Sequence, residues 1–152
     1  MPITARLFGK LPAHGDFVAR GCTPAEQARL DGWLTPSLAE AQARFGAGFA
    51  DRFDVALPWH GSGPGAVGVI AASQDAAGRR YPLVLICAAA DDIEGLIYAA
   101  IIERWDADRL AATAGAGPSS SIERWVPADD TLAFVGATPA GIVTAMLEDA
   151  GA

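Results

Sequence analysis

Lysine is almost absent from this chain, because Lys10 is the only one among its 152 residues. Arginine brings the basic total to 11, against 18 acidic residues, and the net charge is −7. The arginines are scattered, and Arg79 and Arg80 form their only adjacent pair. An acidic protein without a basic stripe repels phosphate backbones and anionic lipid headgroups. The sequence therefore argues against nucleic acid and anionic membranes as partners.

Long hydrophobic runs are missing as well. The most apolar region, residues 83–102, is interrupted by Asp91, Asp92 and Glu94, and is too charged to span a bilayer. The N-terminus shows no basic start followed by a long apolar stretch, which is the pattern of a signal peptide. We therefore expect a cytoplasmic protein without stable membrane insertion.

Cysteine is scarce, with only Cys22 and Cys87. Cys87 lies inside the apolar run 83–90, which predicts a buried thiol. A chain of this length forms enough hydrophobic core to fold without a disulfide. We therefore expect no bridge between the two cysteines.

The hydrophobic half of the chain supplies the core of a single domain, residues 1–152. Alternating apolar patterns predict strands at residues 3–8, 53–57, 66–72, 81–89, 122–126 and 131–135, with turn-rich segments at 58–65 and 73–80. Short turns between consecutive strands favour antiparallel pairing. The predicted fold class is α+β, a single mainly antiparallel sheet flanked by helices on both faces in α/β/α layers, with the order β-α-β-β-β-α-β-β-α.

Three helix starts are indicated by capping residues. Thr23 and Glu26 have the spacing of a capping box. Asp91 and Asp92 precede a second helix, whose positive N-terminal dipole favours acidic residues. Thr138 and Pro139 are predicted to cap a third. Residues 106–121 have no convincing period and are predicted to form a connection with a short helical start.

Three nucleotide or nucleophile motifs are incomplete. Residues 63–68 match G-x-G-x-x-G, but a strand follows them where a phosphate-binding helix is required. Gly9 and Lys10 resemble the end of a P-loop, but Leu11 stands where Ser or Thr must reach magnesium. Ser62 lacks the glycines two residues away on each side that a nucleophile elbow needs. The sequence therefore predicts no nucleotide cofactor.

His14 and Asp16 are two residues apart in a glycine-flanked loop and could act as a general base or as metal ligands. A complete site would need His60, Cys22 or Cys87 to converge on them, and no spacing supports this. The simpler interpretation is that Asp16 accepts backbone hydrogen bonds and fixes the loop.

Two segments resemble the signatures of one known family, TagF, also called ImpM. Residues 8–18, FGKLPAHGDFV, resemble its opening signature, which reads close to GKLPxxGDFV. Residues 73–83, SQDAAGRRYPL, resemble its second signature, S-x-D-x-x-G-R-x-[YF]-P-L. We call them the first and second signature segments. The candidate site residues that they supply are Gly9, Lys10, Leu11, Pro12, Gly15, Asp16 and Phe17 in the first, and Ser73, Asp75, Gly78, Arg79, Tyr81 and Pro82 in the second.

The resemblance implies a role in the post-translational control of bacterial type VI secretion. Family members are typically repressors linked to a threonine-phosphorylation pathway and its forkhead-associated scaffold protein. We therefore expect a non-enzymatic regulator, without cofactor or metal, that binds a protein partner such as that scaffold. The alternatives are a small hydrolase that uses His14 and Asp16, or a structural component of the secretion assembly. His14 stands where the family often has Arg or Ser, which weakens a catalytic role.

The two signature segments are predicted to lie side by side. The carboxylate of Asp16, between Gly15 and the apolar Phe17, is expected to be drawn inward and to bind backbone amides or Arg79, because a buried carboxylate needs partners.

Overall fold

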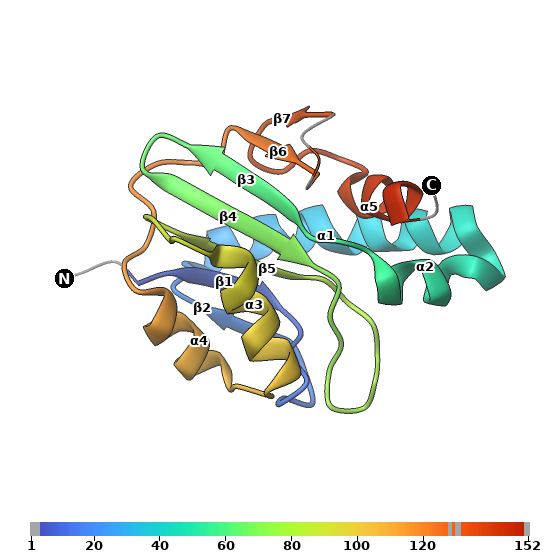
Figure 1. Cartoon of the computed structure of the whole chain (residues 1–152), viewed down its shortest axis with the longest axis horizontal. Helices are drawn as coiled ribbons and strands as arrows, with labels where there is room; N and C mark the ends of the chain where they lie inside the picture. Colours follow the sequence, from blue (N-terminus) through green and yellow to red (C-terminus); the bar gives the residue numbers. More distant parts are fainter. Residues whose placement is uncertain (1–3, 128, 130–131, 151–152) are drawn as a thin grey trace.

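The computed structural model of the chain describes residues 4–127, 129 and 132–150, and within them seven strands form one antiparallel sheet (Figure 1). The strands are β1 (Arg6–Gly9), β2 (Val18–Arg20), β3 (Trp59–Gly63), β4 (Ala66–Ala71), β5 (Leu83–Cys87), β6 (Arg124–Val126) and β7 (Phe134–Val135). Their order across the sheet is β2-β1-β5-β4-β3-β6-β7. The N-terminal strand β1 therefore pairs with β5 from the middle of the chain, and Gly9 lies opposite Leu83.

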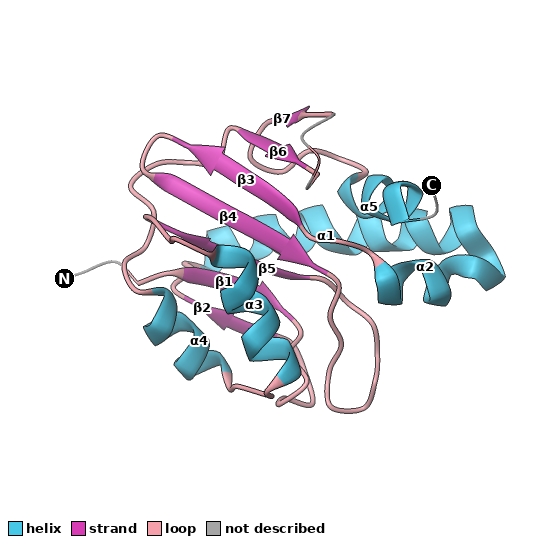
Figure 2. Cartoon of the chain, viewed as in Figure 1, coloured by secondary structure: helices cyan, strands magenta, loops and turns pink. Residues whose placement is uncertain are grey.

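Helices cover both faces of the sheet (Figure 2). The helices are α1 (Pro24–Phe45), the 3-10 turn η1 (Gly46–Gly48), α2 (Phe49–Val55), α3 (Ile93–Ile102), α4 (Ala107–Ala114) and α5 (Ile142–Ala150). One hydrophobic cluster joins α1, α2 and α5 to the sheet, and a second joins α3 and α4 to its other face. The predicted class, α+β with α/β/α layers, is confirmed.

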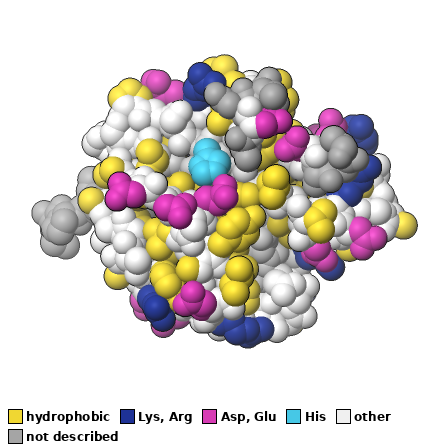
Figure 3. All heavy atoms as spheres, in the orientation of Figure 1, with side chains coloured by type: hydrophobic (Ala, Val, Ile, Leu, Met, Phe, Trp, Pro, Cys, Tyr) yellow, Lys and Arg dark blue, Asp and Glu magenta, His cyan; other side chains and the backbone are white. Residues whose placement is uncertain are grey.

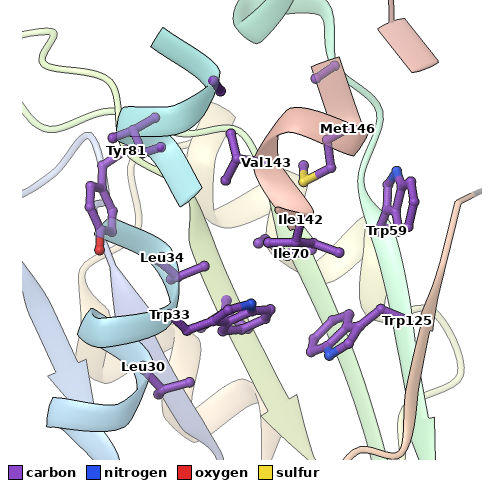
Figure 4. Packing of buried hydrophobic residues seen from close by; sticks show 14 of the residues in the cluster. Leu30, Trp33, Leu34, Trp59, Ile70, Tyr81, Trp125, Ile142, Val143 and Met146 are labelled. Atoms are coloured by element: carbon purple, nitrogen blue, oxygen red, sulfur yellow. The ribbon is translucent and has the colours of Figure 1, made fainter. Parts of the chain in front are cut away.

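The larger cluster is built around aromatic side chains. Trp33 of α1 and Trp125 of β6 lie with their ring centroids 5.5 Å apart, and Ile142 and Met146 of α5 pack nearby (Figure 4). Buried aromatic residues of this size dominate the energetics of a core. Because Trp33 packs against Trp125, α1 is held against the part of the sheet that contains β3 and β6.

The predicted caps of the first two helices are present. Thr23 accepts from the N–H of Glu26, and the Glu26 side chain accepts from the N–H of Thr23. Asp92 accepts from the N–H of Gly95 at 2.9 Å. The predicted cap of the last helix is wrong, because α5 begins at Ile142 rather than after Pro139. A backbone N–H group in the first turn of α5 is bound instead by Ser37 of α1, because the Ser37 hydroxyl accepts from the N–H of Val143 at 2.9 Å.

The element order differs from the predicted one. The strand expected at residues 53–57 is wrong, because α2 runs through Phe53 to Val55. Phe49 and Phe53 are one helical turn apart and stack at 5.4 Å in the core, and this spacing outweighs the local alternation of residues 53–57. Strand β3 occupies much of the segment expected to be a turn, residues 58–65.

Strand β2 and most of α4 were not expected either, although a short helical start was predicted within residues 106–121. The expected strands at 3–8 and 131–135 each include one end residue outside the described part of the chain. Strand β1 ends at Gly9, one residue past the predicted range, and β7 covers only Phe134–Val135 of its range. Strands β4, β5 and β6 fall within the predicted ranges. Cys87 is buried in β5 as predicted, and both Cys22 and Cys87 are free thiols.

Candidate functional site: the junction of the two signature segments

The two signature segments lie side by side, as predicted. The first leaves the sheet at the end of β1, and the second enters it at the start of β5, the strand that pairs with β1. The Ser73 hydroxyl donates to the carbonyl oxygen of Lys10 at 2.7 Å. The N–H of Ala76 donates to the carbonyl oxygen of His14 at 2.7 Å. We call this contact region the signature junction.

Two glycines are required by the backbone of the junction. Gly9 has φ +136°, and a Cβ there would clash with the carbonyl oxygen of Pro82. Gly78 has φ +83°, in the left-handed region that favours glycine, and its N–H closes the second segment's turn onto the carbonyl oxygen of Asp75. A side chain at either position would therefore strain the approach of the two segments.

Asp75 is the centre of the junction, with a relative accessible surface of 1%. Its carboxylate accepts from the N–H groups of Ala77 at 2.9 Å and Arg79 at 3.0 Å. It also binds Nε of Arg79 at 2.7 Å and Nζ of Lys10 at 3.1 Å. One buried acid therefore joins the first segment, through Lys10, to the turn of the second.

These partners keep the carboxylate ionised. Burial alone would raise the pKa of Asp75, but hydrogen bonds from the Arg79 N–H, the Lys10 and Arg79 side chains and the Ala77 N–H outweigh it. The pKa falls from 3.8 to about 2. The buried Lys10 therefore has an ionised carboxylate beside it at neutral pH.

Arg79 adds a second link between the segments, because its Nη2 donates to the carbonyl oxygen of Gly15 at 2.8 Å. Arg80 points elsewhere and forms a two-point ion pair with Asp54 of α2, with both N–O distances at 2.7 Å. The adjacent arginines therefore have separate roles, one inside the junction and one at its border with α2.

Phe17 is the most exposed large hydrophobic side chain of the junction, at 46%. Its ring lies edge-on to Tyr81 at 4.8 Å and stacks on Phe8 at 6.1 Å. The ammonium of Lys10 sits 4.8 Å from the Phe17 ring centroid. These contacts hold an exposed aromatic ring in a fixed orientation.

A groove of about 430 Å³ opens beside this ring. Its lining residues are Phe8, Phe17, Pro24, Gln27, Ala28 and Asp31. Tyr81 closes the junction behind the groove, where its hydroxyl lies 2.9 Å from Thr35 of α1, and burial raises its pKa to about 12. The groove is therefore largely apolar, with one carboxylate on its rim.

The prediction for Asp16 is confirmed in one part, its bond to a backbone amide, and wrong in the other, its inward placement. Asp16 is exposed, its Oδ1 accepts from the adjacent N–H of Phe17 at 2.7 Å, and Arg79 is bound to Asp75 and Gly15. The loop turns Phe17 partly outward, so Asp16 is not drawn into the core. The inward carboxylate that the sequence led us to expect exists, but it belongs to the second segment.

His14 has a structural role in this arrangement. Its Nε2 accepts from the N–H of Ala107 at 3.0 Å, in the first turn of α4. His60 lies on β3 and binds Glu94 at 2.8 Å. In the described part of the chain, no three His, Cys, Asp or Glu side chains gather as a metal site would require. The remaining signature residues Leu11 and Pro12 are buried, and the Pro12 carbonyl oxygen accepts from Arg104.

The role of Asp75 was missed because its partners are distant in sequence, although one local signal pointed to it. Asp followed three residues later by Gly and then by Arg is typical of a tight turn closed by an Asx side chain. That spacing predicts the two backbone bonds. The ion pair with Lys10 depends on the pairing of β1 with β5, and this pairing is not visible in either segment alone.

The fold defines the broad class of the chain, an α+β protein with one antiparallel sheet between two helical layers. The family model described as the TagF N-terminal domain, type VI secretion system-associated, matches residues 6–131. The chain belongs to this family and is a type VI secretion-associated protein. No helix among the described residues is long and apolar enough to cross a membrane.

A solved structure resembles the whole fold. The crystal structure of PA0076 from Pseudomonas aeruginosa PAO1 matches with a TM-score of 0.63 and 25% sequence identity, over 96% of this chain and 77% of that chain. No curated protein sequence matches the chain.

Proposed function

We propose that this protein is a non-enzymatic regulator of type VI secretion that represses the system by binding a protein partner in the cytoplasm. The observation that carries the proposal is that the charged side chains of the signature junction are bound internally, whereas an aromatic ring is exposed beside a groove. The reactive side chains Lys10, Asp75, Arg79 and His14 are engaged in internal bonds. The exposed large hydrophobic side chain of the junction is Phe17, which lies beside a groove.

A held aromatic ring is suited to binding rather than to chemistry. Aromatic anchors in well-packed surroundings dominate protein interfaces, and a ring that is already fixed loses little conformational entropy on binding. Phe17 meets both conditions through its contacts with Tyr81, Phe8 and Lys10. The buried ion pair keeps the platform rigid while the rim stays available.

The partner that we propose is the forkhead-associated scaffold protein of the type VI threonine-phosphorylation pathway. This part of the proposal rests on the family resemblance, and the groove supplies a surface for it. Cytoplasmic action agrees with the two free thiols of Cys22 and Cys87, which persist in a reducing compartment.

The test is a gene deletion in the native host, complemented with the wild type, Phe17→Ser or Val135→Ser. Val135 is a matched control, because it is 85% exposed on β7 at the far edge of the sheet. Secreted effector is measured by immunoblot and transcripts of the secretion genes by quantitative PCR. Deletion should raise secretion without changing transcripts, and the wild type and Val135→Ser should restore repression while Phe17→Ser does not. If deletion leaves secretion unchanged under conditions in which the secretion system is active, the proposal is wrong.

A further inference from the structure

Helix α3 is apolar on its outward face as well as on the face that packs against the sheet. Its inward residues Ile93, Ile97 and Ala100 are buried. A surface helix normally carries polar and charged residues on the opposite side. Here Ile102 is 76% exposed and Tyr98 is half-buried, and Glu94 is the only charged residue of the helix.

The apolar surface continues from α3 towards α2. Ile101 shares a groove of about 290 Å³ with Phe53, Asp54 and the start of the second signature segment. Hydrophobic side chains gather along α3 on the face shown in Figure 3. We call Tyr98, Ile101 and Ile102 the α3 patch. Exposed apolar patches on a folded protein mark interaction surfaces.

Acidic residues flank this patch. Asp91, Asp92 and Glu94 crowd the N-terminal end of α3, where Glu94 binds His60, and Figure 3 shows acidic side chains beside the histidine. At the other end of the helix, exposed Glu103 is followed by exposed Arg104, so the excess of negative charge lies at the N-terminal end. The whole chain carries a net charge of −7, so the field over the patch favours a cationic partner.

We propose that the α3 patch docks an amphipathic helix of a partner protein, with an apolar face flanked by Lys and Arg. The apolar face covers Tyr98, Ile101 and Ile102, and the basic flank meets Asp91, Asp92 and Glu94 at the N-terminal end of α3. This is the helix-in-groove mode of recognition. The ten residues of α3 span about 15 Å, so three turns of a partner helix cover it.

The α3 patch is distinct from the Phe17 groove, although Ile101 shares a groove with Ser73 of the second signature segment. It lies on the side of the sheet covered by α3 and α4, whereas the Phe17 groove is walled by α1 on the other side. The docking proposal therefore does not depend on the proposed secretion role, and the two are tested by different variants.

The probe is a fluorescein-labelled amphipathic peptide of about 18 residues with Leu on one face and Lys on the other. A matched peptide carries Glu in place of Lys. Binding to the full chain is measured by fluorescence anisotropy at low salt and at about 0.5 M salt, which screens the charges. Ile102→Ser removes the most exposed apolar side chain of α3 without changing charge, Asp91→Lys reverses one flanking charge, and Val135→Ser is the matched exposed control. Circular dichroism confirms that each variant is folded.

The basic peptide should bind at least about ten-fold more tightly than the acidic one, and salt should weaken it. Ile102→Ser should weaken binding by about five-fold or more, and Asp91→Lys should weaken it and flatten its salt dependence. Val135→Ser should bind like the wild type. Equal affinities for the two peptides, or equal affinities of Ile102→Ser and Val135→Ser, would overturn the proposal. It is also overturned if sedimentation shows a wild-type dimer that Ile102→Ser dissociates, because the occupant is then a second copy of this chain.

Discussion

Two carboxylates of the signature segments, Asp75 and Asp16, occupy opposite environments. Asp75 is enclosed and has four donors, two from backbone N–H groups and two from charged side chains. Asp16 is exposed and accepts only from its neighbour Phe17 among the bonds that the structure describes. The difference shows that one signature carboxylate is bound inside the fold while another lies at the surface. Resemblance to a signature alone does not distinguish these environments.

The largest expected effect is from Asp75→Asn. The variant leaves the buried ammonium of Lys10 and the guanidinium of Arg79 without a negative partner, and removing one member of a buried pair is strongly destabilising. We expect the melting temperature to fall by about 10 °C, measured by differential scanning calorimetry. Asp16→Asn is the control with the same chemical change. A fall of no more than about 2 °C for Asp75→Asn would show that the pair contributes little net stability.

The difference in melting temperature between the wild type and Asp75→Asn should depend on pH, because the pKa of Asp75 is lowered in the folded protein. A carboxyl group whose pKa is lower in the folded state stabilises the fold fully above its unfolded pKa, and this contribution is lost as pH falls towards the folded pKa. For Asp75 the window runs from 3.8 down to about 2. The gap in melting temperature between wild type and Asp75→Asn should therefore be constant near pH 6, shrink below about pH 4, and nearly close by about pH 2. A gap that stays constant over this range would contradict the assignment of the lowered pKa to Asp75.

An intermediate effect is expected from Lys10→Met, which removes one of the two cations. Asp75 keeps Arg79 and both backbone donors, so its charge remains paired. Methionine keeps an unbranched apolar side chain of similar length at this buried position. The melting temperature should fall by about 5 °C, half the effect of Asp75→Asn. A loss equal to that of Asp75→Asn would mean that Lys10, rather than Arg79, neutralises the acid.

The smallest effect on stability is expected from Asp16→Asn. An exposed Asn side chain keeps an oxygen that can accept from the N–H of Phe17, so the melting temperature should change by less than about 1 °C. In the complementation assay the variant separates fold from function. Loss of repression without loss of stability would place Asp16 in the partner-binding rim, and a substantial loss of stability would restore the buried role that the structure contradicts.

The sequence predicted most reliably what depends on near neighbours. The capping box of Thr23 and Glu26 and the cap of α3 by Asp92 are local, and both are present. The layered fold followed from the alternation of strand and helix patterns. The segment 53–57 was misjudged because its alternating residues suit a strand, and only the packing of Phe49 on Phe53 shows that the chain is helical there.

In the candidate site, too, the sequence predicted local features but not contacts between distant segments. Glycines, an Asx turn and the two signature segments were visible, and their proximity was predicted correctly. The carboxylate that binds Arg79 was not predicted correctly, because Asp75 and Asp16 each lie in a segment that contacts Arg79. Which one is enclosed depends on how Phe17 is held by Tyr81, a contact between segments distant in the sequence.

The enclosure of the only lysine changes how the folded protein reacts with amine reagents. Lys10 is buried and its ammonium is bound to Asp75, so acylation of its side chain requires the junction to open. Amine cross-linkers are therefore poor tools for mapping the partner of the native protein, and photoactivated or carboxyl-directed reagents suit it better. The same protection makes Lys10 a built-in reporter, because its rate of acylation measures how often the junction opens.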